Sequence, residues 1–234
     1  MIELNKVYKA DCRQLVKKLN PESVNLVYSD ILFGTGRDFG DYKDLKSERK
    51  IIEEFYRPLL IDLKIIMVSD ASILLQMDYR ISHWMRCLLD DVFGYNNFVN
   101  EIIWHRTGGG RSENYFARKH DNIFWYAKDK DKFTFNVDAI REPYSKTSTY
   151  ANYGTVINGK EYKPNPKGKI PDDVWYIPME NITSKTRVDY ASQKPVKLAD
   201  KIILACSNSG DVVFDHSWDL EQHLFQQRKM EESF

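Results

Sequence analysis

Hydrophobic and polar positions along the chain alternate between the spacing of strands and that of helices. The apolar run VNLVYSD at 24–30 and the run ASILLQMD at 71–78 have the length and composition of buried strands. Between them, apolar residues at three- and four-residue intervals predict a helix from about 53 to 67. Alternation of this kind predicts an α/β fold, with a sheet covered by helices on both faces.

The same pattern continues on both sides of this region. Residues 5–11 are predicted to form a short strand, residues 12–19 a helix, and residues 81–93 a further helix. Strands are expected at 100–106 and 121–128, separated by a glycine-rich loop. Regularity returns after residue 193 with a helix and with a strand at 212–214. The apolar positions of that last helix are Val196, Leu198, Ile202 and Ile203.

Residues 128–185 lack this periodicity. Tyr, Pro, Asn, Gly and Lys dominate the segment, and YGTVINGKEYKPNPKGKIPDD has neither helical nor strand spacing. We therefore expect a core at 1–127, an irregular insertion at 128–185, a return to the core at 186–215, and an aberrant tail at 216–234.

Composition narrows the class of protein only slightly. A chain of 234 residues suffices for one α/β domain with a large insertion. No apolar run reaches the roughly 18 residues of a membrane span, and the first residues lack a secretion signal. We therefore expect a cytoplasmic protein without a membrane partner. The three widely separated cysteines suggest reduced thiols rather than disulfides or a zinc site.

Charge is balanced overall but unevenly distributed. The chain has 34 basic and 34 acidic residues, yet residues 105–169 hold 13 Lys and Arg against 7 Asp and Glu. Residues 211–234 show the opposite bias, with 2 basic residues against 6 acidic ones. The basic middle is compatible with contact to nucleic-acid phosphates, although a solvated loop region would show the same bias.

A basic loop within this region, WHRTGGGRSENYFARKH, surrounds three glycines with cations. Tyr115 and Phe116 in the same loop are available for stacking on bases. An ordinary hairpin loop is the alternative interpretation. His105 and His120 have no metal-ligand spacing, so no metal site is predicted. The residues predicted to bind DNA are His105, Arg106, Arg111, Arg118 and Lys119.

The order of these blocks resembles that of the β-group of amino-methylating DNA methyltransferases. The segments that carry the resemblance are NLVYSDILFGTGRDF, NEIIWHRTGGGRS and QKPVKLADKIILACSNSGDVVFD, and they reach over nearly the whole chain up to Asp215. The resemblance implies a Rossmann-like methyltransferase sheet that is incomplete in this chain on its C-terminal, cofactor-loop side. It further implies that the insertion at 128–185 is the region that recognises the DNA target. It also implies methyl transfer from S-adenosylmethionine to adenine N6 in duplex DNA, with a cognate restriction system or a homodimer as further partners. An RNA substrate is a weaker alternative.

In such enzymes a strand ending in Asp-Pro-Pro-Tyr or Asp-Pro-Pro-Phe supplies the pocket for the target base. Asp30 and Phe33 match the two ends of that motif, whereas Ile31 and Leu32 stand in place of the prolines. The resemblance implies that the Asp30 carboxylate and the Ile31 carbonyl accept hydrogen bonds from the exocyclic amine, while Phe33 stacks on the extruded base. An aspartate here favours adenine over cytosine. Capping of the following turn is the alternative role for Asp30.

The resemblance also implies which residues hold the cofactor. Asp11 would meet the adenine amine of S-adenosylmethionine, and Gln193, Lys194 and Pro195 would lie beside its carboxylate. An ordinary surface lysine is the alternative reading of Lys194. Asp215 ends the strand that runs, in the family, into Pro-Phe-x-Gly-x-Gly, a turn that approaches the methionine part. No glycine follows Asp215 in this chain.

The codons for residues 215–234 offer an explanation. Read from the third base of the Asp215 codon, Trp218 with Asp219 forces a glycine, and permitted codons elsewhere give a string that begins PFMGSGTT. We therefore expect that one base was lost here, that residues 216–234 pack poorly, and that cofactor binding is impaired. A naturally divergent tail is the other reading, and the encoding DNA sequence would decide. A non-catalytic DNA-binding module or partner subunit is the alternative function.

Overall fold

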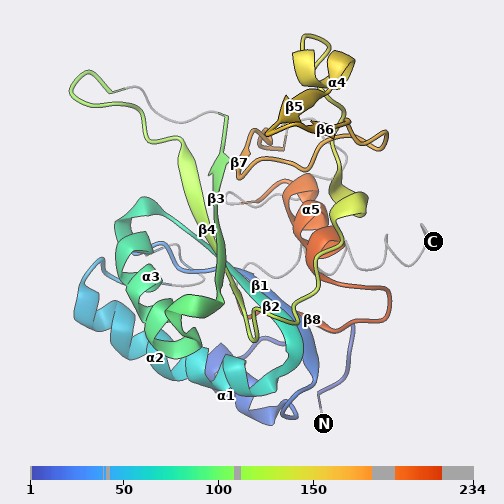
Figure 1. Cartoon of the computed structure of the whole chain (residues 1–234). Helices are drawn as coiled ribbons and strands as arrows, with labels where there is room; N and C mark the ends of the chain where they lie inside the picture. The colour runs from blue at the N-terminus through green and yellow to red at the C-terminus, as the bar shows by residue number, and fades with distance from the viewer. Residues whose placement is uncertain (1, 39, 41–42, 108–111, 181–192, 218–234) are drawn as a thin grey trace.

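The computed structural model describes residues 2–38, 40, 43–107, 112–180 and 193–217. A six-stranded mixed sheet, in the order β7-β3-β4-β2-β1-β8, forms its centre (Figure 1). Its strands are β1 (Val24–Asp30), β2 (Met67–Met77), β3 (Phe98–His105), β4 (His120–Ala127), β7 (Val174–Trp175) and β8 (Val213–Phe214). Strands predicted from the apolar runs are therefore confirmed within a few residues for β1, β2, β3, β4 and β8.

The central strands end together at one edge of the sheet. β1 pairs in parallel with β2 and β8, whereas β4 runs antiparallel to β2 and β3. Asp30 at the end of β1 lies opposite Gln76 of β2, and the next residue of β2, Met77, lies opposite Asn122 near the start of β4. In sheets of this type, ligands bind outside the carboxyl ends of the parallel strands. This edge is therefore where a site is expected.

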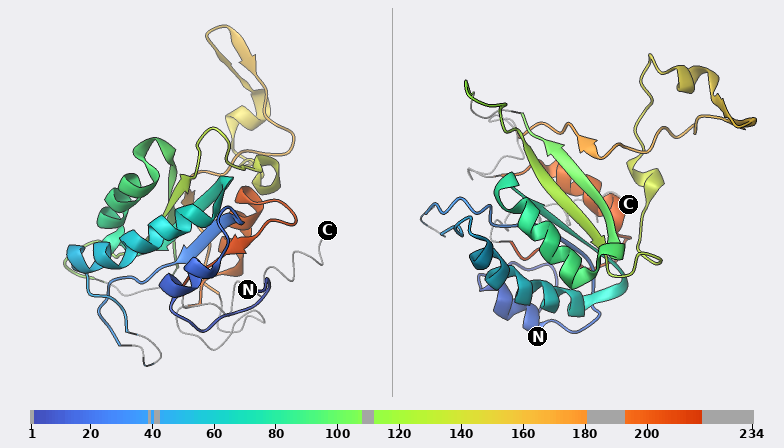
Figure 2. Two further views of the ribbon diagram at one scale, coloured as in Figure 1. Left: turned by 90° about the horizontal axis from the view of Figure 1, so that it is seen from below. Right: turned by 60° about the vertical axis from the view of Figure 1, so that its left-hand side comes forward.

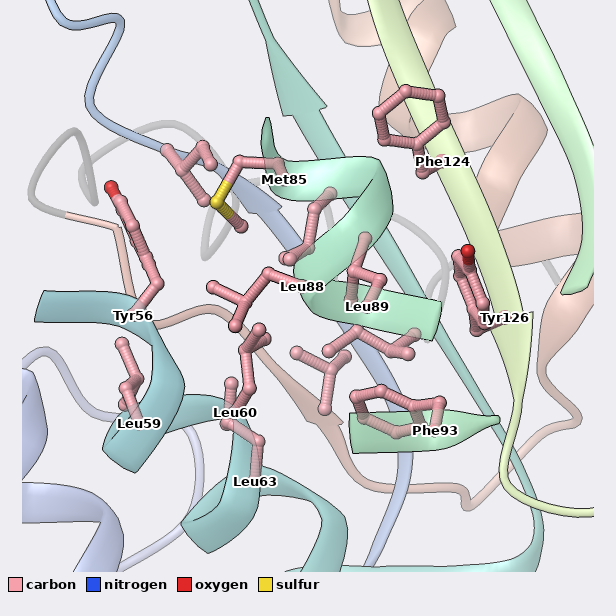
Figure 3. Packing of buried hydrophobic residues seen from close by; sticks show 14 of the residues in the cluster. Tyr56, Leu59, Leu60, Leu63, Met85, Leu88, Leu89, Phe93, Phe124 and Tyr126 are labelled. Atoms are coloured by element: carbon pink, nitrogen blue, oxygen red, sulfur yellow. The ribbon is translucent and has the colours of Figure 1, made fainter. Parts of the chain in front are cut away.

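One face of the sheet is covered by α1 (Cys12–Leu15), the 3-10 turn η1 (Val16–Lys18), α2 (Arg49–Ile66) and α3 (Tyr79–Phe93). The apolar stripe of α2 packs against α3, because its buried residues recur at three- and four-residue intervals, and α3 in turn packs against β4. Each such side chain contributes about 1.5–3 kcal/mol when fully buried. Figure 3 shows this cluster, which includes Tyr56, Leu59, Leu60, Leu63, Met85, Leu88, Leu89, Phe93, Phe124 and Tyr126.

Helix α5 (Val196–Cys206) covers the opposite face (Figure 2). Its buried residues Leu198 and Ile202 pack in a second cluster with Tyr28 of β1 and Trp104 of β3. Helices on both faces of a mixed sheet confirm the predicted α/β class. Within the described ranges, no helix combines the length and apolar content needed to cross a bilayer.

The region predicted as an insertion forms a small unit apart from the sheet and then rejoins it. The unit contains α4 (Thr149–Tyr153), β5 (Thr155–Ile157) and β6 (Lys160–Tyr162), and it follows the 3-10 turn η3 (Val137–Ile140) (Figures 1 and 2). β7 then pairs with β3, and the Trp104 indole nitrogen donates to the Ile177 carbonyl over 2.8 Å. This stretch thus contributes an edge strand to the core; residues 181–185 lie outside the described residues.

Two expectations about the ends of the chain are wrong where the structure describes them. Residues 5–11 form no strand; the backbone amide of Glu3 instead donates to the Tyr8 hydroxyl over 2.7 Å. His216 and Ser217 were expected to pack poorly, but they are only 8% and 6% exposed. The His216 backbone amide donates to the Ser29 hydroxyl over 3.0 Å, which ties this residue to β1. The rest of the predicted aberrant tail, residues 218–234, lies outside the described residues.

Candidate functional site

Asp30 is the last residue of β1 and is only 8% exposed. The strand geometry continues one residue further, because the Ile31 amide donates to the Gln76 carbonyl over 3.0 Å. Ile31 itself is buried at 4% exposure. Isoleucine at this position therefore gains a backbone hydrogen bond that proline cannot make. This bond holds the backbone beside the aspartate in the absence of the two prolines.

The loop after Asp30 is held by side chains from two other segments. The Leu32 amide donates to the Tyr56 hydroxyl over 3.1 Å. The Gly34 and Thr35 amides both donate to the carboxylate of Asp44, over 3.2 Å and 2.7 Å. Asp44 is only 4% exposed, so these bonds form away from water and keep the loop in one conformation.

Lys194 joins this loop from a distant part of the sequence. It directly precedes Pro195, the N-cap residue of α5, and its ammonium donates to Oδ2 of Asp30. The same ammonium lies 4.9 Å from the centroid of the Phe33 ring. The Lys194 and Asp30 side chains are only 10% and 5% exposed. The structure thus brings together two residues predicted to hold the target base and one predicted to hold the cofactor.

A buried polar network that the sequence analysis missed lies beside Asp30. The Tyr28 hydroxyl donates to Oε1 of Gln76 over 2.9 Å, and Nε2 of Gln76 donates to Oδ2 of Asp121 over 3.1 Å. Asp121 is completely buried, and burial raises its pKa, while the cations of Arg106 and Lys194 act against that rise. The sequence does contain a signal for this network, because Gln76 and Asp121 are polar residues that adjoin the apolar runs of β2 and β4.

The surroundings of this network also raise the pKa of Tyr28, the tyrosine that donates to Gln76. Tyr28 is 2% exposed, and its pKa is raised well above the ordinary value. Burial is the main cause, and the negative charges of Asp30, Asp215 and Asp121 add to it. Three carboxylates therefore surround one buried phenol, which stays protonated and remains a hydrogen-bond donor.

The remaining residues predicted to hold the cofactor occupy three places. Gln193 is 5% exposed and stands with Pro195 before the first turn of α5. Asp215 follows β8, whose residue Phe214 pairs with Val27, so that the carboxylate comes to the same edge as Asp30. Asp215 accepts hydrogen bonds from the amide and hydroxyl of Ser217 over 2.8 Å and 2.6 Å.

Asp11 has a capping role in the structure. Its carboxylate accepts from the Arg13 amide over 2.9 Å at the start of α1, and it pairs with the Arg13 guanidinium over 2.7 Å. The hydrogen bond from the Arg13 side chain is the main reason that the pKa of Asp11 is lowered. A cofactor amine would have to compete with this arginine.

The base of the predicted DNA-binding loop is a regular hairpin. His105 and His120 pair across β3 and β4, and the Arg106 amide donates to the Lys119 carbonyl over 2.9 Å. The Arg106 guanidinium lies 3.7 Å from Oδ1 of Asp121. Arg106 was predicted to bind DNA, but the structure directs its charge toward the buried aspartate.

The outer part of the loop presents aromatic side chains and one stacked arginine. The Arg118 guanidinium lies 4.5 Å from the ring centroids of both Tyr79 and Tyr115, and it donates to the Tyr79 hydroxyl. Phe116 beside it is 98% exposed. The hairpin projects past the edge of the sheet at which Asp30 lies (Figure 1). Arg111 lies outside the described residues.

Comparison with known proteins identifies the class to which this fold and site belong. Residues 24–216 match the DNA methylase family of N6/N4 methyltransferases. Because the match covers most of the sequence, the chain belongs to this family, which confirms the resemblance drawn from its motifs.

Individual relatives agree with this assignment. The chain is 31% identical over 202 residues to the type II methyltransferase M.HpaI of Haemophilus parainfluenzae, covering 86% of this chain and 59% of M.HpaI. It is 25% identical over 221 residues to the DNA adenine methyltransferase YhdJ of Escherichia coli strain K12, covering 91% and 71%. The PvuII DNA methyltransferase (cytosine-N4-specific) has a similar fold, with a TM-score of 0.61 at 14% identity over 89% of this chain and 72% of its own. The chain thus spans less than two thirds of the length of M.HpaI.

Proposed function

We propose that this protein is a site-specific DNA methyltransferase that methylates the exocyclic amine of a base extruded from duplex DNA. One observation carries the proposal: a buried carboxylate, Asp30, ends a central strand of the sheet with an aromatic ring, Phe33, three residues further on. Family membership and the similarity to M.HpaI support the same reaction. S-adenosylmethionine is the proposed source of the methyl group.

The residues of this site are suited to orient an amine. The Asp30 carboxylate and the Ile31 carbonyl are acceptors for the two N–H groups of an exocyclic amine, which would direct the nitrogen lone pair away from the sheet edge. The Phe33 ring, held by the loop hydrogen bonds around it, offers a flat surface on which the base can stack. Because binding has already oriented the amine, less entropy is lost in reaching the transition state than for free reactants.

The described residues also fit the amino-acid part of the proposed cofactor. The side-chain amide of Gln193 and the amino end of α5 are donors suited to a carboxylate. Asp215, at the same edge, is an acceptor suited to an ammonium group. When bound, S-adenosylmethionine supplies an electrophilic methyl group. Asp11 would complete the site only if the adenine amine replaced its Arg13 contact.

Adenine N6 is the proposed target atom. An aspartate at the position of Asp30 and the similarity to the adenine methyltransferase YhdJ support it. The insertion at 128–185 is the proposed target-recognition region, and the part of it at 146–167, around α4, β5 and β6, is basic. Its exposed lysines are suited to phosphate contact; they are Lys146, Lys160, Lys163 and Lys167. The cytoplasm is the proposed location. A cognate restriction endonuclease or a second copy of the chain is a proposed partner.

A two-part assay tests this function. Calorimetry measures S-adenosylmethionine binding, and transfer of labelled methyl groups to duplex DNA, followed by nucleoside analysis, identifies the modified base. Asp30→Ala is expected to lower transfer about a hundredfold or more, because an electrostatic acceptor at the reacting group is lost. Asp70→Ala, which removes an exposed aspartate from the other end of β2, serves as the control.

Three outcomes of this assay would contradict the proposal. DNA binding without cofactor binding would support a non-catalytic DNA-binding module. Transfer that is unchanged in Asp30→Ala would remove the proposed role of this carboxylate. Preferential methylation of structured RNA in competition with duplex DNA would identify a different substrate.

A further inference from the structure

Lys194 contacts one buried carboxylate, and its charge acts on a second. Its ammonium donates to Oδ2 of Asp30, and its positive charge opposes the rise in pKa that burial causes at Asp121. Gln76 connects the two acids, since its backbone pairs with Asp30 in the sheet and its side chain donates to Asp121. Gln76 therefore connects Asp121 to the strand residue whose carboxylate Lys194 contacts.

Asp121 still has acceptor capacity. Oδ1 of this aspartate forms no hydrogen bond within the described part of the chain, and its ion pair with Arg106 spans 3.7 Å. A completely buried carboxylate oxygen without a hydrogen bond is costly, so a donor that reaches it is favoured. A lysine side chain has four flexible carbons and three donors, which lets it exchange one acceptor for another nearby.

The ammonium at Asp30 is unfavourable for the proposed reaction. A target amine needs the Asp30 carboxylate as an acceptor, and Oδ2 already accepts from Lys194. Positive charge develops on the amine nitrogen as the methyl group arrives, and a neighbouring ammonium repels that charge. Transfer is therefore favoured when the Lys194 ammonium leaves Asp30, which frees Oδ2 and removes the repulsion.

We propose that Lys194 is a positioning residue for the target-amine site: its ammonium fixes the Asp30 carboxylate in the free protein and moves to Asp121 when a base enters. The proposal rests on the methyltransferase function argued above. It differs from the role that the resemblance gives to Lys194, which is contact with the cofactor carboxylate. Among the described residues, the charged and titratable groups that interact electrostatically with this position are Asp30, Asp78, Asp121, Asp215, Arg106, Tyr28 and Tyr56.

The first experiment separates the two roles of Lys194 without using methyl transfer. Carbon-13 NMR follows the carboxyl resonance of Asp30, assigned with Asp30→Asn, while calorimetry measures S-adenosylmethionine affinity. In Lys194→Met we expect the Asp30 titration midpoint to move to higher pH, because the stabilising cation is gone. Cofactor affinity is expected to stay within about twofold. Lys197→Met, an exposed lysine on the first turn of α5, is the matched control.

The opposite pattern would overturn the proposal. A cofactor dissociation constant raised about tenfold or more, with an unchanged Asp30 titration, would identify Lys194 as a cofactor ligand instead. Lys194→Gln keeps a side-chain donor without the charge and replaces Lys194→Met if that variant does not fold. Because neither measurement needs turnover, an inactive wild-type chain would contradict the proposed function but leave this test interpretable.

The second experiment tests Asp121 as the receiving carboxylate. In Asp121→Asn the ammonium has no second anion to move to, so we expect kcat to fall about tenfold while cofactor affinity is kept. In the double variant Lys194→Met/Asp121→Asn no ammonium has to move, so kcat is expected to rise above that of Asp121→Asn. Such non-additivity is a sign of direct coupling between two residues. An unchanged kcat in Asp121→Asn, or independent effects of the two substitutions, would show that Asp121 does not receive the lysine.

Discussion

The side-chain amide of Gln76 donates to Oδ2 of Asp121 over 3.1 Å and so connects two polar residues in the interior of adjacent strands. Asp121 is completely buried, and burial is the main reason that its pKa is raised above the ordinary 3.8. The hydrogen bond from Gln76 and the charges of Arg106 and Lys194 offset only part of this effect. The ionised carboxylate therefore costs folding free energy, although it is suited to a role in the site.

We predict that Asp121→Asn raises the free energy of unfolding at neutral pH. A raised pKa means that the folded state binds the proton more tightly than the unfolded state. The contribution of Asp121 to the free energy of unfolding therefore falls as pH rises above 3.8, through the pKa of the folded state. The gain is on the order of 1 kcal/mol, the size of a typical net contribution of one buried polar interaction. Urea titrations at several pH values measure it.

The pH dependence distinguishes this cause from a general improvement in packing. The advantage of Asp121→Asn is expected to disappear as pH falls below 3.8, where the wild-type side chain is also neutral. An advantage that stayed constant over the whole range would contradict the electrostatic explanation. Together with the expected loss of turnover in the same variant, a gain in stability would show that the chain sacrifices stability for its site.

Gly34 is predicted to be necessary for the loop that follows Asp30. Its φ is +69°, and an added Cβ would lie 2.6 Å from Cγ2 of the buried Ile81. Gly34→Ala therefore combines an unfavourable left-handed conformation with overpacking, which typically costs about 1–3 kcal/mol. We expect a lower melting temperature together with reduced methyl transfer, measured by thermal unfolding and by the transfer assay.

Gly40 offers a matched control for this substitution. Its φ is +86°, but no atom of the described residues lies within 4 Å of an added Cβ. Gly40→Ala therefore carries the conformational cost alone. If both variants lost the same stability, the contact with Ile81 would play no part, and the packing argument for Gly34 would be wrong.

Features of this fold that are set by neighbouring residues could be predicted from the sequence. Features that depend on contacts between distant residues could not. β1 was predicted residue for residue, because a short, mostly apolar run bounded by polar turn residues has the length and composition of a buried strand. The strand at 5–11 was wrong, because short alternating patterns form strands only when a neighbouring strand accepts their hydrogen bonds. The contact between Lys194 and Asp30 joins residues 164 positions apart, and no local pattern encodes it.

Tyr126→Phe is predicted to destabilise the fold by about 1.5 kcal/mol. The Tyr126 hydroxyl donates to Oδ1 of Asp90 over 2.5 Å, and bonds to charged groups contribute more than neutral ones. Asp90 keeps its contact with Arg86, whose guanidinium lies 3.6 Å from the Phe98 ring centroid, so the carboxylate does not become unpaired. Urea unfolding measures the loss.

A tyrosine on the surface of the protein serves as the control for this loss of stability. Tyr95 is 70% exposed, and Tyr95→Phe is expected to stay within about 0.5 kcal/mol of wild type. Equal effects of the two substitutions would mean that the buried hydroxyl contributes nothing beyond an ordinary surface group.

Phe116→Ala is predicted to weaken DNA binding without changing stability. The ring is 98% exposed, so its removal uncovers no core, while stacking on a base is worth about 1–3 kcal/mol. The neighbouring Arg118, fixed between Tyr79 and Tyr115, limits the freedom that this part of the hairpin would lose on binding. We therefore expect the dissociation constant for duplex DNA, measured by fluorescence anisotropy, to rise about fivefold or more.

Salt dependence separates stacking from charge at this hairpin. Phe116→Ala should leave the slope of log affinity against log salt unchanged, whereas Lys119→Ala should reduce the slope by about one if that lysine contacts a phosphate. Tyr95→Ala removes an exposed aromatic ring just before β3, at the opposite end of the strand from the hairpin, and should alter neither quantity. Equal losses of affinity in Phe116→Ala and Tyr95→Ala would mean that exposed aromatic rings act nonspecifically, and that the hairpin does not meet the DNA through Phe116.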